Sequence, residues 1–334
     1  MDQGRLRLSL AWNGQCIVAA DLASTRPRAA RLLVGLPVER AVELVPRLFS
    51  LCGQAQGVAA RLAWRAAGGE LPDATALLED GRRVALEAIC EHLWRLLLDW
   101  PPLLGLPVRK DEFLAWRKRL LAVADQAGAA QLGGELGAWL STQTLPMLGQ
   151  DALAAPAVLL PSLTAGAWAQ RSVDEAFAEN PTFAGLPAET GPLARRCADA
   201  EVATLCAAGQ GVAARLAARH ADLRFLAAAL VEPQRLAGWL DAAPVAGNVG
   251  LARVETARGL LLHLTQVKDG RVEGYVIVAP TEWNFHPQGA FAREIIGCPA
   301  ANRAQAALAA RRVALALDPC VAYEIVVNEV AEDA

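Results

Sequence analysis

Paired cysteines are missing from this sequence. It contains seven cysteines, an odd number, and no two of them are spaced as Cys-x-x-Cys. The spacing excludes a zinc ribbon or knuckle, and an odd, scattered set does not favour a disulfide framework. We therefore expect most of the thiols to be small buried side chains and a few to remain as candidate ligands.

Long apolar runs and blocks of one charge are also absent. The longest apolar stretches, such as residues 225–231, are too short to cross a bilayer, and the first residues lack the apolar core of a signal peptide. The formal net charge is −3 and basic residues form no long run, so nucleic-acid binding has no electrostatic support. These absences predict a cytoplasmic protein that binds neither membranes nor nucleic acids.

The composition that is present is that of a folded protein. The chain has 334 residues, of which 54% are hydrophobic and 20% charged. Alternating residues predict strands over 5–35, helical spacing dominates over 38–240, strands return over 249–280, and a C-terminal motif occupies 318–330. We expect a single α+β domain over 1–334, mainly a helical bundle flanked by N- and C-terminal β-hairpins.

Four motifs occur in a fixed order along the chain. They are SLCGQAQG at 50–57, GPLAR at 191–195, ARGLLLHLTQVKDGRVEGYVIVAPTEWNFHP at 257–287 and DPC at 318–320. Each motif alone is a weak signal, but the ordered set is specific. Together they resemble the large, nickel-iron-bearing subunit of hydrogenases, and the resemblance spans nearly the whole chain. It implies a hydrogenase large-subunit-like fold.

The same resemblance exposes ligands that this chain lacks. In the family, two cysteine pairs supply four thiolates, and two of these bridge nickel and iron. Cys52 and Cys320 stand where the first cysteine of each pair is expected, whereas Ala55 and Tyr323 replace the second. Neither alanine nor tyrosine supplies a soft bridging sulfur. We therefore expect no nickel, no stable binuclear site and no enzyme activity.

The iron side of the family's pocket is retained. The resemblance aligns Arg258 with an arginine poised over the diatomic ligands of iron, and Pro280 and Thr281 with a stretch that hydrogen-bonds a cyanide. Arginine and threonine supply a charged and a neutral donor for such ligands. The resemblance thus implies Cys52 and Cys320 as metal ligands, and Arg258, Pro280 and Thr281 as contacts to the iron-bound diatomics.

This combination is similar to the hydrogenase accessory proteins of the HoxV/HupK family, which are shortened relatives of the large subunit. The resemblance implies a non-catalytic maturation scaffold that transiently holds an Fe(CN)2(CO) fragment. Its implied partners are the hydrogenase large subunit, a HypC-type chaperone and the iron-fragment assembly complex. Two thiolates instead of four suit a carrier that must also release its metal.

Simpler explanations stay open for the candidate ligands. The alternative for Cys52 is a small side chain packed at a helix junction. The alternative for Cys320 is a buried thiol beside a helix turn that Asp318 caps and that Pro319 begins. For Arg258, it is a guanidinium that pins a loop by pairing with a carboxylate such as Glu255.

Other groups and other functions also remain. Cys298 and His286 are further candidates for the site, and His263 is expected to be a hydrogen-bonded core residue rather than a ligand. One alternative function is a metal-free interaction protein in hydrogenase assembly complexes. The other is a degenerate large subunit that still turns over hydrogen, which Ala55 and Tyr323 argue against.

Overall fold

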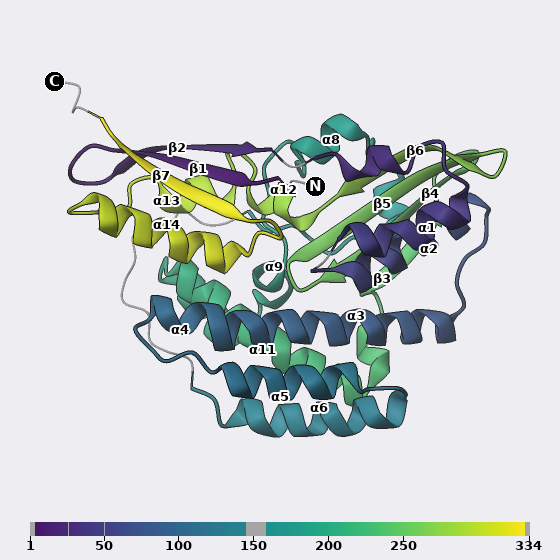
Figure 1. The fold of residues 1–334 in the computed structure, drawn as a ribbon, viewed down its shortest axis with the longest axis horizontal. Helices are drawn as coiled ribbons and strands as arrows, with labels where there is room; N and C mark the ends of the chain where they lie inside the picture. The colour runs from purple at the N-terminus through teal and green to yellow at the C-terminus, as the bar shows by residue number, and fades with distance from the viewer. Residues whose placement is uncertain (1–3, 26, 50, 145–157, 331–334) are drawn as a thin grey trace.

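The computed structural model describes residues 4–25, 27–49, 51–144 and 158–330. Its strands are β1 (Leu6–Trp12), β2 (Ile17–Ser24), β3 (Leu240–Pro244), β4 (Val249–Thr256), β5 (Gly259–Lys268), β6 (Arg271–Val278) and β7 (Tyr323–Glu329). The strands form two separate sheets, one at each end of the layer drawn uppermost in Figure 1, with long helices beneath.

Helices make up most of the rest. They are α1 (Val38–Leu48), α2 (Gly53–Ala67), α3 (Ala74–Trp94), α4 (Trp100–Leu103), α5 (Lys110–Leu121), α6 (Gln126–Ser141), α7 (Ala165–Ala169), α8 (Glu175–Glu179), α9 (Pro192–Arg196), α10 (Ala200–Ala207), α11 (Gly211–Val231), α12 (Pro280–Asn284), α13 (Ala290–Ile295) and α14 (Arg303–Leu317). Short 3₁₀ helices occupy η1 (Ala29–Leu32) and η3 (Pro233–Leu236), and a π-helical turn, η2 (Arg95–Asp99), joins α3 to α4. In the described part of the chain, no helix is both long enough and apolar enough to cross a membrane.

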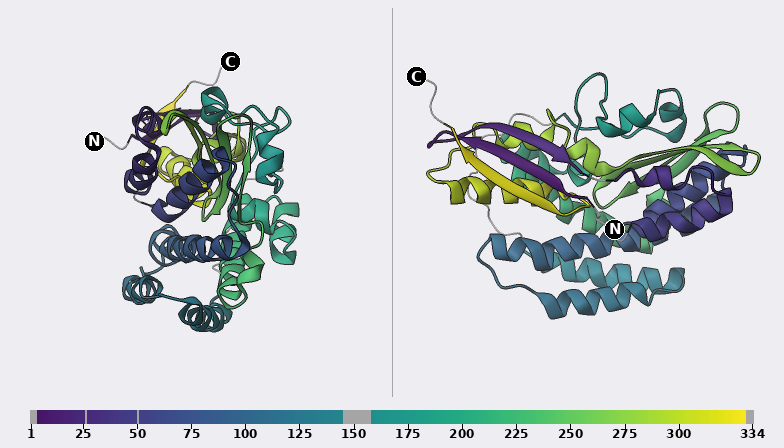
Figure 2. Two further views of the ribbon diagram at one scale, coloured as in Figure 1. Left: turned by 90° about the vertical axis from the view of Figure 1, so that its right-hand side faces the viewer. Right: turned by 45° about the horizontal axis from the view of Figure 1, so that its top comes forward.

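The two ends of the chain meet in one sheet of order β2-β1-β7. β1 pairs antiparallel with β2 and parallel with β7, in a register that sets Leu6 opposite Tyr323. In Figure 2 the yellow β7 runs beside the purple β1. Leu6, Leu8 and Leu10 alternate along β1 and are buried, so one face of this sheet packs on the core.

The second sheet is antiparallel, of order β3-β4-β5-β6. Helix α2 lies directly against β4: a Cβ on Gly250 would lie 2.2 Å from the carbonyl oxygen of Ala63. Glycine is required here because the helix and strand backbones approach too closely for a side chain. This contact fixes α2, and with it the residue at its N-terminus, relative to the sheet.

Long helices cover one side of this layer (Figures 1 and 2). α3 and α11 contact each other, and α6 packs on α11 so closely that a Cβ on Gly133 would lie 2.5 Å from the Ala227 carbonyl oxygen. Side-chain caps define several helix starts: Asp73 accepts from the Ala76 N–H, and Asp125 from the Gly128 N–H. The largest apolar cluster lies among these helices and the second sheet.

Several predicted boundaries are wrong. The predicted C-terminal hairpin is a four-stranded sheet, because its residues form the three strands β4, β5 and β6 and the unpredicted β3 adds to the edge. The last α-helix before this sheet, α11, ends at Val231, and only the short η3 follows it before β3 begins at Leu240. β3 has the sequence LDAAP, which shows little of the alternation that marks a strand. β7, within the predicted C-terminal motif, joins the N-terminal hairpin, a pairing between chain ends that local sequence does not specify.

Candidate functional site

The structure brings Cys52 and Cys320 together from distant parts of the sequence. Cys52 is the residue that precedes the first turn of α2, and Cys320 lies between α14 and β7. Both thiols are half-buried. Burial, reinforced by the neighbouring Cys320 thiol, raises the pKa of Cys52 well above its usual value. Without a bound cation, Cys52 is therefore a protonated thiol at neutral pH.

Thr281 forms two hydrogen bonds with Cys320. Its hydroxyl donates to the Cys320 sulfur at 3.1 Å and accepts from the Cys320 backbone N–H, also at 3.1 Å. Pro280 occupies the first turn of α12, where its missing N–H is no loss, and so presents Thr281 at the start of the helix. The predicted pair Pro280–Thr281 thus lies directly against one of the two predicted thiol ligands.

Arg258 lies in the turn between β4 and β5 and is buried. The Thr256 hydroxyl accepts its backbone N–H at 3.1 Å, which fixes the turn. Its guanidinium forms an ion pair with Glu91 of α3, and its Nε lies 3.3 Å from Asp318 Oδ1. The suggested partner Glu255 instead pairs with Arg195 at 2.7 Å. Arg258 is thus pinned by carboxylates, but not by the one expected from sequence.

Asp318 is the anionic centre of the site. It ends α14 with a left-handed φ of 56°, and β7 follows it, so the expectation that it caps a helix turn begun by Pro319 is wrong. Arg95 Nε lies 2.7 Å and Arg219 Nη1 3.1 Å from its carboxylate. Burial opposes its ionisation, but Arg258, Arg95 and Arg219 outweigh burial and hold the pKa of Asp318 well below its usual range.

Two glutamates on α3 were missed by sequence reasoning. The Glu87 carboxylate accepts from the backbone N–H groups of Gln54 and Ala55, at 2.7 and 3.0 Å, and so caps the start of α2 beside Cys52. Burial raises the pKa of Glu87 to about 7, and burial raises the pKa of Glu91 to about 7 despite Arg258. The available signal was two acidic residues four apart, one turn of an apolar helix.

The two further candidates have other surroundings. Cys298 is buried in the apolar cluster beneath β1, where its carbonyl accepts from the Ile17 N–H. His286 accepts the Gln288 backbone N–H on its Nδ1. Within the described residues, no three His, Cys, Asp or Glu side chains form a group that could hold a metal ion. The thiol pair is thus the candidate site, without a third protein ligand among the described residues.

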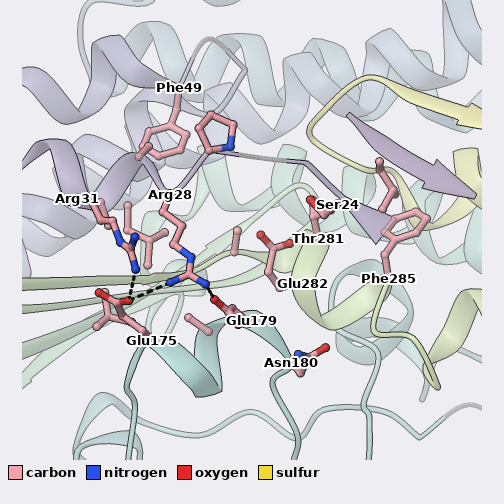
Figure 3. A pocket seen from close by; sticks show the side chains of 18 of the residues that line it. Ser24, Arg28, Arg31, Phe49, Glu175, Glu179, Asn180, Thr281, Glu282 and Phe285 are labelled. Atoms are coloured by element: carbon pink, nitrogen blue, oxygen red, sulfur yellow. Dashed lines mark hydrogen bonds and ion pairs between the residues drawn. The ribbon is translucent and has the colours of Figure 1, made fainter. Parts of the chain in front are cut away.

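A cleft of about 430 Å³ lies beside the site. Thr281 lines it, as do side chains from the end of β2, η1, α8 and β6. Figure 3 shows Arg28 and Arg31 reaching across to α8, where both contact Glu175, at 3.2 and 3.0 Å. Because Thr281 also contacts the Cys320 sulfur, one side chain separates the cleft from Cys320.

Comparison with known sequences identifies related proteins along nearly the whole chain. The nickel-dependent hydrogenase profile matches residues 238–325. The chain is 34% identical to the hydrogenase expression/formation protein HoxV of Cupriavidus necator, over 91% of this chain and 92% of that protein. It is 35% identical to the corresponding HupK of Rhizobium leguminosarum bv. viciae, over 95% and 94%.

The fold matches solved large subunits at low sequence identity. A NiFeSe hydrogenase structure from Desulfovibrio vulgaris Hildenborough superposes with a TM-score of 0.65 at 16% identity, covering 92% of this chain and 93% of that one. The reduced enzyme from Desulfomicrobium baculatum gives 0.65 at 13% identity, covering 93% and 95%. The expected α+β, hydrogenase large-subunit-like fold is confirmed. With this fold and these relatives along nearly its whole length, the chain belongs to the HoxV/HupK family of hydrogenase expression/formation proteins.

Proposed function

We propose that this chain is a non-catalytic scaffold in nickel-iron hydrogenase maturation, which holds an Fe(CN)2(CO) fragment before its transfer to the hydrogenase large subunit. The observation that carries the proposal is the meeting of Cys52 and Cys320 beside Arg258 and Thr281. The names of the relatives support a role in maturation. Those names do not specify what the protein carries, so the Fe(CN)2(CO) cargo is inferred from the chemistry of the site.

The fragment suits two thiols because it brings three diatomic ligands of its own, so the protein need not complete the coordination shell. Thiols lose their protons when they bind a metal, and they regain them when it leaves. The high pKa of Cys52 favours the protonated thiol and therefore favours release. Two thiols hold iron less firmly than four bridging and terminal thiolates do, as a carrier requires.

Charge and access support the same cargo. Arg258 places a buried cation beside the thiols, which offsets the negative charge of thiolates and cyanide. The cleft lined by Thr281 offers a route for the fragment between the surface and Cys320. We propose that the partners at this cleft are a HypC-type chaperone with the iron-fragment assembly complex, and then the large subunit, all in the cytoplasm.

Infrared spectroscopy tests the proposal. Protein purified anaerobically with its assembly partners is expected to show bands from iron-bound carbon monoxide and cyanide, and Cys52→Ala or Cys320→Ala should remove them. Cys206→Ala, at an exposed thiol, is the matched control and should retain them. Bands that persist in both ligand variants would contradict the assignment of the thiol pair.

One alternative has an observation in its favour. Arg258 is already paired with Glu91 and Asp318, so the site is charge-compensated without cargo, as a metal-free interaction protein would need. That alternative predicts no infrared bands in the wild-type protein and unchanged capture of the large subunit by Cys52→Ala. Hydrogen-dependent dye reduction by the isolated protein would instead indicate an enzyme, an outcome that Ala55 and Tyr323 oppose.

A further inference from the structure

A row of buried polar side chains ends on the sulfur of Cys52. Gln56, one turn further along α2, places its Nε2 3.8 Å from Cys52 Sγ. Its Oε1 lies 2.8 Å from His263 Nε2 on β5, and His263 Nδ1 lies 2.7 Å from the Tyr275 hydroxyl on β6. The exposed fractions of Gln56, His263 and Tyr275 are 1%, 0% and 6%, so all three side chains are buried. His263 is thus a hydrogen-bonded core residue, as expected, but its partners lead to the site.

The chemistry of these groups fixes the direction of every bond. An amide oxygen only accepts, so the His263 Nε2 that faces Gln56 carries the hydrogen. Burial lowers the pKa of His263 to about 3, so the ring is neutral and its Nδ1 can only accept. The Tyr275 hydroxyl must therefore donate to it. Each donor in the row points toward Cys52, and the last one, the Gln56 amide N–H, points at the sulfur.

Mutual pairing of buried polar groups is common and would by itself indicate only a satisfied core. The sulfur at the end of the row makes the difference, because a metal-bound thiolate accepts hydrogen bonds and cannot donate one. The row has the polarity that a thiolate requires. Partners behind a metal ligand commonly fix its orientation and its strength as a donor.

We propose that Gln56, His263 and Tyr275 are positioning residues for Cys52, which deliver one N–H donor to its sulfur and so set how strongly it binds the cargo iron. This inference rests on the proposed function. The row is anchored on rigid elements: His263 and Tyr275 lie on adjacent, paired strands, and Glu87 caps the start of the helix that carries Gln56. The donor is therefore held in place before any metal arrives.

A metal-free measurement tests the polarity of the row. The chain has four histidines, so ¹⁵N NMR of histidine-labelled protein is tractable, with His263→Asn to assign the signal. We expect His263 to be the neutral Nε2–H tautomer from pH 5 to 8, and its nitrogen shifts to change in Gln56→Leu. A neutral Nδ1–H tautomer, or His263 nitrogen shifts that are the same in Gln56→Leu as in wild type, would overturn the proposal.

Metal binding tests the consequence, with cobalt(II) alone as the probe. Gln56→Leu should weaken cobalt binding to the thiol pair by about 10-fold or more, as loss of a partner behind a metal ligand commonly does. The exposed Gln54 on the same helix supplies the control Gln54→Leu, which should bind as wild type. Equal affinities for Gln56→Leu and wild type would overturn the proposal.

Tyr275→Phe keeps the ring and removes only the outermost donor, so it remains informative if Gln56→Leu does not fold. It should lower cobalt affinity by less than Gln56→Leu, and in cargo-loaded protein it should shift the carbon monoxide band to lower frequency, because a less hydrogen-bonded thiolate donates more charge to iron. The control is Thr265→Val, since Thr265 pairs with Tyr275 across the sheet and its hydroxyl has no hydrogen-bond partner in the described structure. An unshifted band would overturn the proposal.

If wild-type protein binds neither cobalt nor cargo, the scaffold function fails, and the NMR result still decides the polarity of the row.

Discussion

Single residues near the thiol pair differ in how far sequence could identify them. Cys52, Cys320, Arg258 and Thr281 belong to motifs, and the structure brings them together; their roles toward a metal stay a prediction. Asp318 belongs to a motif as well, but its three arginine partners come from α11, η2 and the β4–β5 turn. Such convergence is a tertiary property that no local pattern encodes.

Removing the charge of Asp318 should be costly. Asp318→Asn keeps the shape, and asparagine tolerates the left-handed φ, so the change isolates the loss of one buried anion among three guanidinium groups. Loss of one partner from a buried ion pair costs about 3–5 kcal/mol of unfolding free energy, measured by urea denaturation. Asp269→Asn is the control: it also has a positive φ, of 50°, but is exposed, and should change stability by less than about 0.5 kcal/mol. Equal losses would show that backbone conformation, not charge, matters at Asp318.

Helices and strands with strong periodicity were predicted well, and short or unusual ones were not. β1, β2 and α3 have alternating or helical apolar patterns and caps or turns at their ends. β3 is short and pairs with the neighbouring β4, whereas β7 pairs with β1 at the other end of the chain. Strand pairing is therefore what could not be predicted from local sequence, because the partner strand decides whether a half-buried segment becomes part of a sheet.

Close packing of α2 on β4 should position Cys52. In Gly250→Ala the new Cβ meets the backbone of α2 at 2.2 Å, so the helix must shift away from the sheet. We expect a loss of about 1–3 kcal/mol in urea denaturation and weaker cobalt binding, because Cys52 moves with the helix. Gly274→Ala is the control on β6, where the nearest atom, at 3.5 Å, belongs to the flexible Gln266 side chain. Wild-type cobalt affinity in folded Gly250→Ala would show that this packing does not position the thiol.

Over the whole molecule, buried charges unite segments that are distant in sequence. Asp318 links the C-terminal motif to α11, and Arg258 links the second sheet to α3 through Glu91. His92 of α3 contacts Asp222 through Nε2, at 3.1 Å, while its Nδ1 lies 2.9 Å from Arg219. The site and the fold therefore share one ionic network, and the pH dependence of stability should report on it.

The unfolding free energy should show a plateau between pH 4.5 and 6.5. Burial lowers the pKa of His92 to about 4 and of His263 to about 3, from an ordinary 6.5, so the neutral rings stabilise the fold above pH 6.5 and that contribution is lost as pH falls. Burial raises the pKa of Glu87 and Glu91 from 4.5 to about 7, which makes stability fall as pH rises through that interval. Between pH 4.5 and 6.5 the two histidines and two glutamates oppose each other. Below pH 4.5 the histidines remain, together with Asp318 and Asp222, whose pKa values their arginine partners hold below the usual range despite burial, so stability should drop steeply.

Two substitutions should tilt the plateau in opposite directions. Glu91→Gln removes one of the two carboxyl groups that lower stability as pH rises. The unfolding free energy should then rise with pH between 4.5 and 6.5 by up to about 1.4 kcal/mol per pH unit. His92→Gln removes one of the two histidines that raise stability as pH rises, so the unfolding free energy should fall with rising pH over the same interval. Urea denaturation at half-unit pH steps measures both slopes, and Glu79→Gln, at an exposed position of the same helix, should leave the plateau flat. If both variants stay flat, these buried groups do not exchange protons with folding, and the plateau arises from the surface charges instead.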